Sequence, residues 1–115
     1  MNDGLAAPVG SITAAFFHFD DPSIDATNYR EIAAILRGAT LESNPLVLDW
    51  SAVTYVDFLG MEMVLDFILD RSGPVAFAGL SRSIRHLLSR MQLLHVLPNA
   101  ESLESAAHLL MSREQ

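Results

Sequence analysis

The most informative chemistry in the chain lies where a carboxylate precedes a helical pattern. Asp57 ends a β-rich segment, Gly60 follows three residues later, and hydrophobic residues then recur with the period of a helix. A carboxylate at a helix N-terminus accepts backbone N–H bonds and meets the positive end of the helix dipole. Asp57 is therefore predicted to cap the helix, and Gly60 to permit a tight turn. Anions also bind at such helix ends, so a sensor of a small anionic ligand or nucleotide is one function to test.

The other residues able to do chemistry form no catalytic or metal-binding motif. The four histidines fall on four different predicted elements, without the paired spacing that binds a metal. Residues 79–83 resemble a Gly-x-Ser-x-Gly nucleophile elbow until the last position, which is Ser83, and Ser81 is more simply a helix N-cap. We therefore expect no enzymatic activity, no metal and no cofactor.

The composition of the 115-residue chain excludes further classes of protein. All seven cations are arginines, and the chain has neither lysine nor cysteine. The absence of lysine excludes Schiff-base enzymes, phosphate-loop NTPases and phospho-receiver domains, the last being the nearest rival because Asp20, Asp21 and Asp49 follow predicted strands. The absence of cysteine excludes disulfides and thiolate chemistry. A net charge of −7 argues against nucleic acid as a partner.

Alternating strand and helix patterns predict a single α/β domain with parallel strands. Strands are predicted at 10–19, 46–50, 53–56 and 75–78, and helices at 27–37, 61–70, 81–91 and 102–111. We expect a flexible N-terminus over residues 1–9, the domain over 10–112 and a short tail over 113–115. The chain shows neither a secretory signal nor an apolar run long enough to cross a bilayer, so we expect a cytoplasmic protein without membrane insertion.

The stretch from Leu46 to Asp57, followed by Gly60 and a helix, resembles the STAS family, the domain shared by sulphate transporters and anti-sigma factor antagonists. The resemblance continues through residues 75–79, 81–91, 93–98 and 102–106, and it covers about residues 10–112. It implies a mixed β-sheet with about four helices packed on it. The function it implies is transcription regulation in bacteria by a protein-interaction module that binds an anti-sigma factor or another STAS or kinase-type protein, and a homodimer stays open. The family also offers an alternative, a subunit of a lipid- or anion-transport assembly.

The chain departs from the phosphorylated antagonists of this family at one position. In those proteins a serine or threonine directly after the aspartate is phosphorylated by an anti-sigma kinase, and the added charge expels the partner. Here the two residues after Asp57 are Phe58 and Leu59, and neither has a hydroxyl. The resemblance therefore predicts that Phe58 replaces the phospho-switch with a constitutive apolar contact.

Helical spacing predicts two further surfaces. Met63 and Phe67 fall on a polar helix face, where they would extend the partner-binding loop of residues 57–60 unless another element covers them. On the next helix the outward positions are cationic, at Arg82, Arg85 and Arg90. Residues 1–70 hold 2 cations and 11 anions, whereas residues 71–115 hold 5 cations and 3 anions. The arginines are thus either a contact face for an acidic partner or a solvated face.

Overall fold

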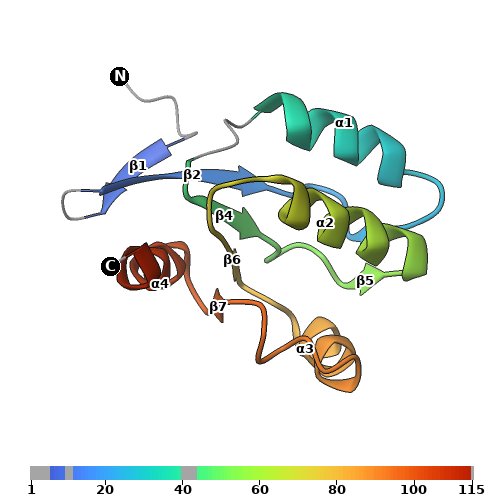
Figure 1. Ribbon diagram of the computed structural model, residues 1–115. Coiled ribbons are helices and arrows are strands. Elements are labelled where there is room, and N and C mark those ends of the chain that lie inside the picture. Colours follow the sequence, from blue (N-terminus) through green and yellow to red (C-terminus); the bar gives the residue numbers. More distant parts are fainter. Residues whose placement is uncertain (1–5, 10–11, 40–43, 115) are drawn as a thin grey trace.

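The computed structural model describes residues 6–9, 12–39 and 44–114, and it shows strands and helices alternating along the chain (Figure 1). The helices are α1 (Tyr29–Ala39), α2 (Phe58–Asp70), α3 (Arg82–Arg90) and α4 (Leu103–Glu114). The strands are β1 (Ala6–Val9), β2 (Ile12–His18), β3 (Ser23–Ile24), β4 (Leu46–Asp49), β5 (Tyr55–Val56), β6 (Val75–Ala78) and β7 (Asn99–Ala100).

The main sheet has the strand order β1-β2-β4-β6-β7. Strands β2, β4, β6 and β7 run parallel, and β1 runs antiparallel to β2. A second, two-stranded sheet pairs β3 with β5 in parallel. The predicted α/β fold with a mixed sheet and four helices is confirmed, and β4 is the central strand because its continuous apolar run is buried on both faces.

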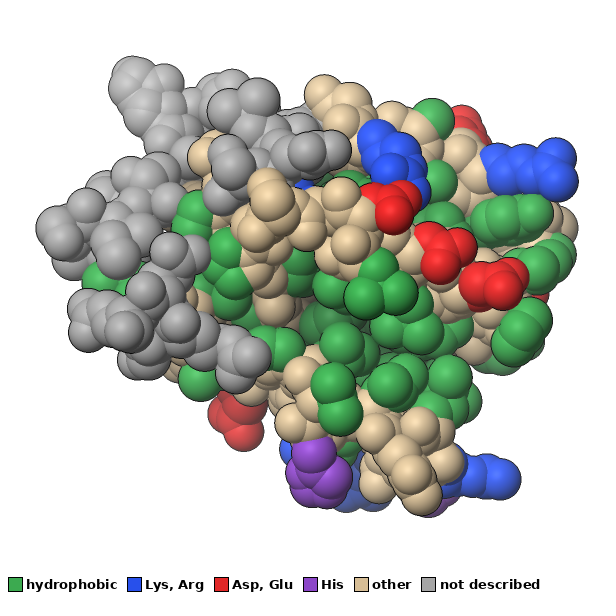
Figure 2. All heavy atoms as spheres, in the orientation of Figure 1, with side chains coloured by type: hydrophobic (Ala, Val, Ile, Leu, Met, Phe, Trp, Pro, Cys, Tyr) green, Lys and Arg blue, Asp and Glu red, His purple; other side chains and the backbone are tan. Residues whose placement is uncertain are grey.

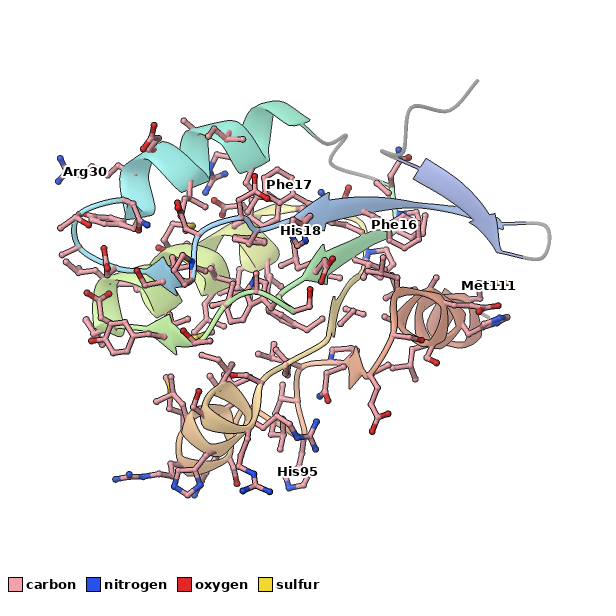
Figure 3. The ribbon with its side chains drawn as sticks, turned by 180° about the vertical axis from the view of Figure 1, so that it is seen from behind. Phe16, Phe17, His18, Arg30, His95 and Met111 are labelled. Carbon is pink, nitrogen blue, oxygen red and sulfur yellow. The ribbon has the colours of Figure 1, made fainter. Side chains whose placement is uncertain are left out.

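The helices cover the two faces of the main sheet unequally. Helices α1, α2 and α3 pack on one face, and α4 alone packs on the other (Figure 1). Alternation along β2 sends Phe17 into the three-helix side and Phe16 to the α4 side, where Met111 also lies (Figure 3). At the centre of the larger core, the fully buried Trp50 makes edge-to-face ring contacts with Phe19 at 5.7 Å and Phe77 at 4.8 Å.

Regular structure extends beyond the predicted domain at residues 6–9 and 113–114. Residues 6–9, which fall in the N-terminal segment expected to be flexible, form β1 and pair with β2. Alanine and Pro8 are poor strand formers, but an edge strand tolerates them because its outer side needs no partner. Helix α4 runs to Glu114 and so includes two residues of the expected tail, Arg113 and Glu114, both of which are good helix formers.

Candidate protein-interaction site

Asp57 caps α2 as predicted, and it also joins the helix to a distant loop. One carboxylate oxygen accepts a hydrogen bond from the N–H of Gly60 at 2.8 Å, and the other accepts from the N–H of Ala26 at 2.9 Å. Because the cap is at residue 57, α2 begins at Phe58, three residues earlier than hydrophobic periodicity indicates. The N-terminus of α2 is thereby tied to the segment between β3 and α1.

That segment is itself held by a second aspartate. The carboxylate of Asp25 accepts bonds from the hydroxyl of Thr27 at 2.6 Å and from its N–H at 3.0 Å. The hydroxyl of Thr27, then its backbone N–H, keep the pKa of Asp25 below its usual value, because both bonds favour the charged carboxylate. The loop that receives Asp57 is thus a compact turn.

Gly60 is required by close packing and not by the tight turn that we predicted. It lies buried inside the first turn of α2, against the backbone of β3. A Cβ atom at this position would lie 2.2 Å from the carbonyl oxygen of Ile24 and 2.7 Å from its carbonyl carbon. The same carbonyl oxygen accepts a hydrogen bond from the N–H of Asp57 at 3.1 Å, so α2 can meet β3 this closely only with glycine at position 60.

Phe58 is an exposed aromatic side chain on this rigid helix start. Phe58 is 75% exposed. The backbone around it is nevertheless fixed, because Asp57 is held by its two hydrogen bonds and Gly60 packs against Ile24. Tyr55 and Leu59 beside it are 56% and 36% exposed. We call the surface of Tyr55, Phe58 and Leu59 the exposed corner. Because its backbone is already fixed, a partner that buries these side chains would lose little conformational entropy in ordering them.

Of the two alternatives that the sequence leaves open for Met63 and Phe67, the structure shows cover by another element, so this pair does not extend the partner-binding loop. These residues are only 7% and 4% exposed, because α1 packs along this side of α2. The guanidinium of Arg37 on α1 lies 5.8 Å from the ring centre of Phe67, and Arg71 lies 5.6 Å from it. Arg37 also forms an ion pair with Asp70 at 3.3 Å. Helical spacing identifies the side of α2 on which Met63 and Phe67 lie, but it does not show that α1 covers that side.

A shallow hollow lies between α1 and α2 next to Leu59. It has a volume of about 290 Å³ and charged side chains on both rims, Arg30 and Arg37 on α1 and Glu62 and Asp66 on α2. The hollow adjoins the exposed corner through Leu59, the neighbour of Phe58. It therefore offers charged hydrogen-bonding groups beside an apolar anchor.

The arginines of α3 are exposed, as helical spacing predicts. Ser81 caps this helix by accepting a hydrogen bond from the N–H of Ile84 at 3.2 Å. Arg82, Arg85 and Arg90 all face solvent, and Arg85 also donates to the side chain of Asn99 at 3.4 Å. A role of this surface in binding stays a prediction.

A hydrogen-bonded pair at the ends of β2 and β4 was missed by sequence reasoning. His18 Nδ1 lies 2.8 Å from a carboxylate oxygen of Asp49, and its Nε2 lies 3.4 Å from Asp20. Burial raises the pKa of Asp49, but the bonds from Ser51 and His18 outweigh it and hold that pKa below its usual value. The residues meet because positions 18 and 49 are directly paired in the parallel register, and no local motif records that pairing.

Within the described residues, nothing resembles a metal centre, since no group of three or more His, Asp or Glu side chains could hold an ion. The anion position at the start of α2 is taken by the carboxylate of Asp57, so the ligand-sensor alternative finds no support there. No helix of the described segments is long and apolar enough to span a bilayer.

The fold defines the class: a small α/β domain whose parallel sheet carries three helices on one face and one on the other. The family model described as "STAS domain" matches residues 10–106, and the chain belongs to the STAS domain family. A search of curated proteins found no match.

Three solved structures show the same fold at low sequence identity. An anti-sigma-factor antagonist (STAS) domain protein from Planctomyces limnophilus aligns with a TM-score of 0.72 and 14% identity, covering 91% of this chain and 94% of that one. A sulfate transporter family protein from Wolinella succinogenes gives 0.65 and 19%, covering 84% and 86%. The murine anion transporter Solute Carrier 26 family member A9 gives 0.70 and 15%, covering 86% of this chain but 18% of the transporter.

Proposed function

We propose that this STAS domain is a non-enzymatic protein-interaction module that acts as an anti-sigma factor antagonist in the bacterial cytoplasm. Its partner would be a kinase-type anti-sigma factor, or a related STAS or kinase-type protein, and binding would regulate transcription. The observation that carries the proposal is the 75% exposure of Phe58 directly after the aspartate that caps α2. An exposed aromatic residue on a fixed backbone is the kind of group that supplies most of the energy of a protein interface.

The docking surface is the exposed corner formed by Tyr55, Phe58 and Leu59. Asp57 holds this corner through its two backbone hydrogen bonds, and the hollow between α1 and α2 lies beside it. Phe58 would enter a pocket of the partner, while the charged rims of the hollow would fix orientation. Asp57 and Gly60 act in this scheme by positioning the corner, and the buried Met63 and Phe67 act by supporting α2.

Phosphorylation at position 58 is chemically impossible here, so the contact would not be released by the usual switch. The test is incubation of the protein with its cognate anti-sigma kinase and ATP, followed by mass spectrometry. We expect no stoichiometric phosphate within residues 51–60. The Phe58→Ser variant is the matched control, because it restores a hydroxyl at the start of α2 and reports whether the kinase is active. Stoichiometric phosphate on the wild-type segment would refute the constitutive contact.

Partner binding is tested by titrating Phe58→Asp. The substitution removes an aromatic side chain that the partner would bury and adds a charge, so it is expected to weaken binding by at least about tenfold. Ile35→Asp is the control, because Ile35 is also apolar and 54% exposed but lies on α1 beside Phe17 and Phe19, away from the corner. Unchanged affinity of the Phe58→Asp variant, with its helical circular dichroism retained, would count against the corner as the docking site.

A second candidate is a subunit of an assembly that transports lipids or anions. It is favoured by the shared fold with the sulfate transporter family protein and with the murine anion transporter described above. Affinity purification of the tagged chain from its own cells distinguishes the candidates. A co-purifying permease or ABC-type ATPase supports transport, and a co-purifying anti-sigma factor supports the antagonist.

A further inference from the structure

An apolar strip runs over the outer surface from α2 towards α3, on the side of α2 away from α1 (Figure 1, Figure 2). We call it the α2–α3 face and define it by Leu65 and Leu69 of α2 and Leu87 and Met91 of α3. Leu69 is 80% exposed and Met91 is 40% exposed, while Leu65 and Leu87 are half-buried against the larger core. Figure 2 shows hydrophobic side chains continuing from the region of α2 to that of α3 across one side of the molecule. Contiguous apolar surface with a polar border is typical of interaction sites.

The two long borders of the α2–α3 face carry opposite charge. On α2 the border is acidic, with the exposed side chains of Glu62, Asp66 and Asp70 in successive turns, and Asp70 is also paired with Arg37 of α1 at 3.3 Å. On α3 the outward side chains are basic, at Arg82 and Arg90. In Figure 2 acidic side chains lie above the hydrophobic surface with arginine side chains next to them, and further arginine and histidine side chains lie below it. The acidic border belongs to residues 1–70, where anions outnumber cations, and the basic border belongs to residues 71–115, where cations outnumber anions.

A surface with an apolar centre and opposite borders is complementary to itself in one orientation. If two copies face each other across a twofold axis parallel to the strip, the rotation exchanges the borders. The acidic border of each copy then meets the arginine border of the other, and the apolar strips meet in the middle. A twofold axis across the strip would instead place carboxylates against carboxylates. We propose that two copies of this chain pair through the α2–α3 face about the axis parallel to the strip.

The charge pattern favours a second copy of this chain as the partner, because each copy carries both the acidic border and the arginine border that would meet. Each copy has a net charge of −7, so contact in most orientations is repulsive. The proposed pairing sets the arginines of α3 against the acidic border of the other copy. It goes beyond the proposed antagonist function, and Leu69 lies eleven residues along α2 from Phe58, about 16 Å away.

Sedimentation velocity tests the dimer directly and needs no partner protein. At high concentration we expect the wild type to have an apparent mass of twice its 12.6 kDa monomer mass. Leu69→Glu is expected to weaken the dimer by about tenfold or more without unfolding the domain, since Leu69 is 80% exposed. Ile35→Glu on α1 is the matched control and should sediment as the wild type does. A monomeric wild type, or a Leu69→Glu variant that pairs as tightly as the wild type, overturns the proposal.

Charge reversal tests the orientation. Glu62→Arg reverses one charge of the acidic border and Arg90→Glu reverses one charge of the arginine border, so each variant alone is expected to dimerise more weakly than the wild type. An equimolar mixture of the two is expected to form a heterodimer, because the border with the new arginine then meets the border with the new glutamate, and the other two facing borders keep their wild-type charges. If the mixture associates no better than each variant alone, the proposed axis is wrong. If wild type stays monomeric while Leu69→Glu loses binding to an anti-sigma factor, the face belongs to that partner and the dimer is refuted.

Discussion

Replacing Gly60 by alanine tests whether the approach of α2 to β3 sets the geometry of the candidate site. The new Cβ atom would lie 2.2 Å and 2.7 Å from the carbonyl oxygen and carbon of Ile24. Both contacts are with backbone atoms, so no side-chain rotation can relieve them. Either α2 or β3 must move, and the hydrogen bond between the N–H of Asp57 and Ile24 is the first to be strained.

The expected cost follows from two opposing effects. Overpacking of this kind costs roughly 3 kcal/mol, at the upper end of the usual range because the clash is with backbone. Alanine returns up to about 1 kcal/mol, because it is the better helix former. We therefore expect a net loss of about 2 kcal/mol in the free energy of unfolding, and for a chain of this size a fall in Tm of about 8 °C.

Urea unfolding followed by the fluorescence of Trp50 measures this effect, because the single tryptophan is fully buried in the core. The control is Gly38→Ala: Gly38 lies in α1, and a Cβ atom there would have no neighbour within 4 Å. That variant should gain about 0.5 kcal/mol. If Gly60→Ala is as stable as the wild type, the close approach to Ile24 does not constrain the site and the reasoning fails.

Two further substitutions test the carboxylates. Asp57→Ala removes the acceptor of the hydrogen bonds from Gly60 and Ala26, and it is expected to lower the free energy of unfolding in urea by about 1–2 kcal/mol. Asp57→Asn keeps one acceptor oxygen and should cost about half as much. Equal losses for the two variants would contradict the two-bond cap. The folded pKa of Asp49 is lowered, so this group stabilises the fold above its unfolded pKa of about 3.9, and that contribution is lost as pH falls through the folded value. Asp49→Asn should therefore flatten the acid limb of stability measured between about pH 5 and pH 2, and an unchanged limb would exclude Asp49 as its source.

Much of the candidate site follows from local chemistry, which the sequence shows directly. A carboxylate before a helical pattern predicts the cap at Asp57, and a serine in the same position predicts the cap at Ser81, because such bonds join residues only three apart. The missing hydroxyl at Phe58 is a fact of covalent structure that no fold alters. Alternating periodicities likewise predict the α/β class.

Contacts between residues far apart in the chain were decided only by the tertiary structure. The burial of Phe67 depends on where α1 packs, the need for Gly60 depends on the carbonyl of Ile24, and the bond between His18 and Asp49 depends on strand register. Hydrophobic periodicity identifies which side of an element is apolar or polar, but it does not record which neighbour lies against that side. The sequence by itself therefore determined the fold class, the helix caps and the loss of the phospho-acceptor. Packing determined which apolar side chains on α2 are left for a partner.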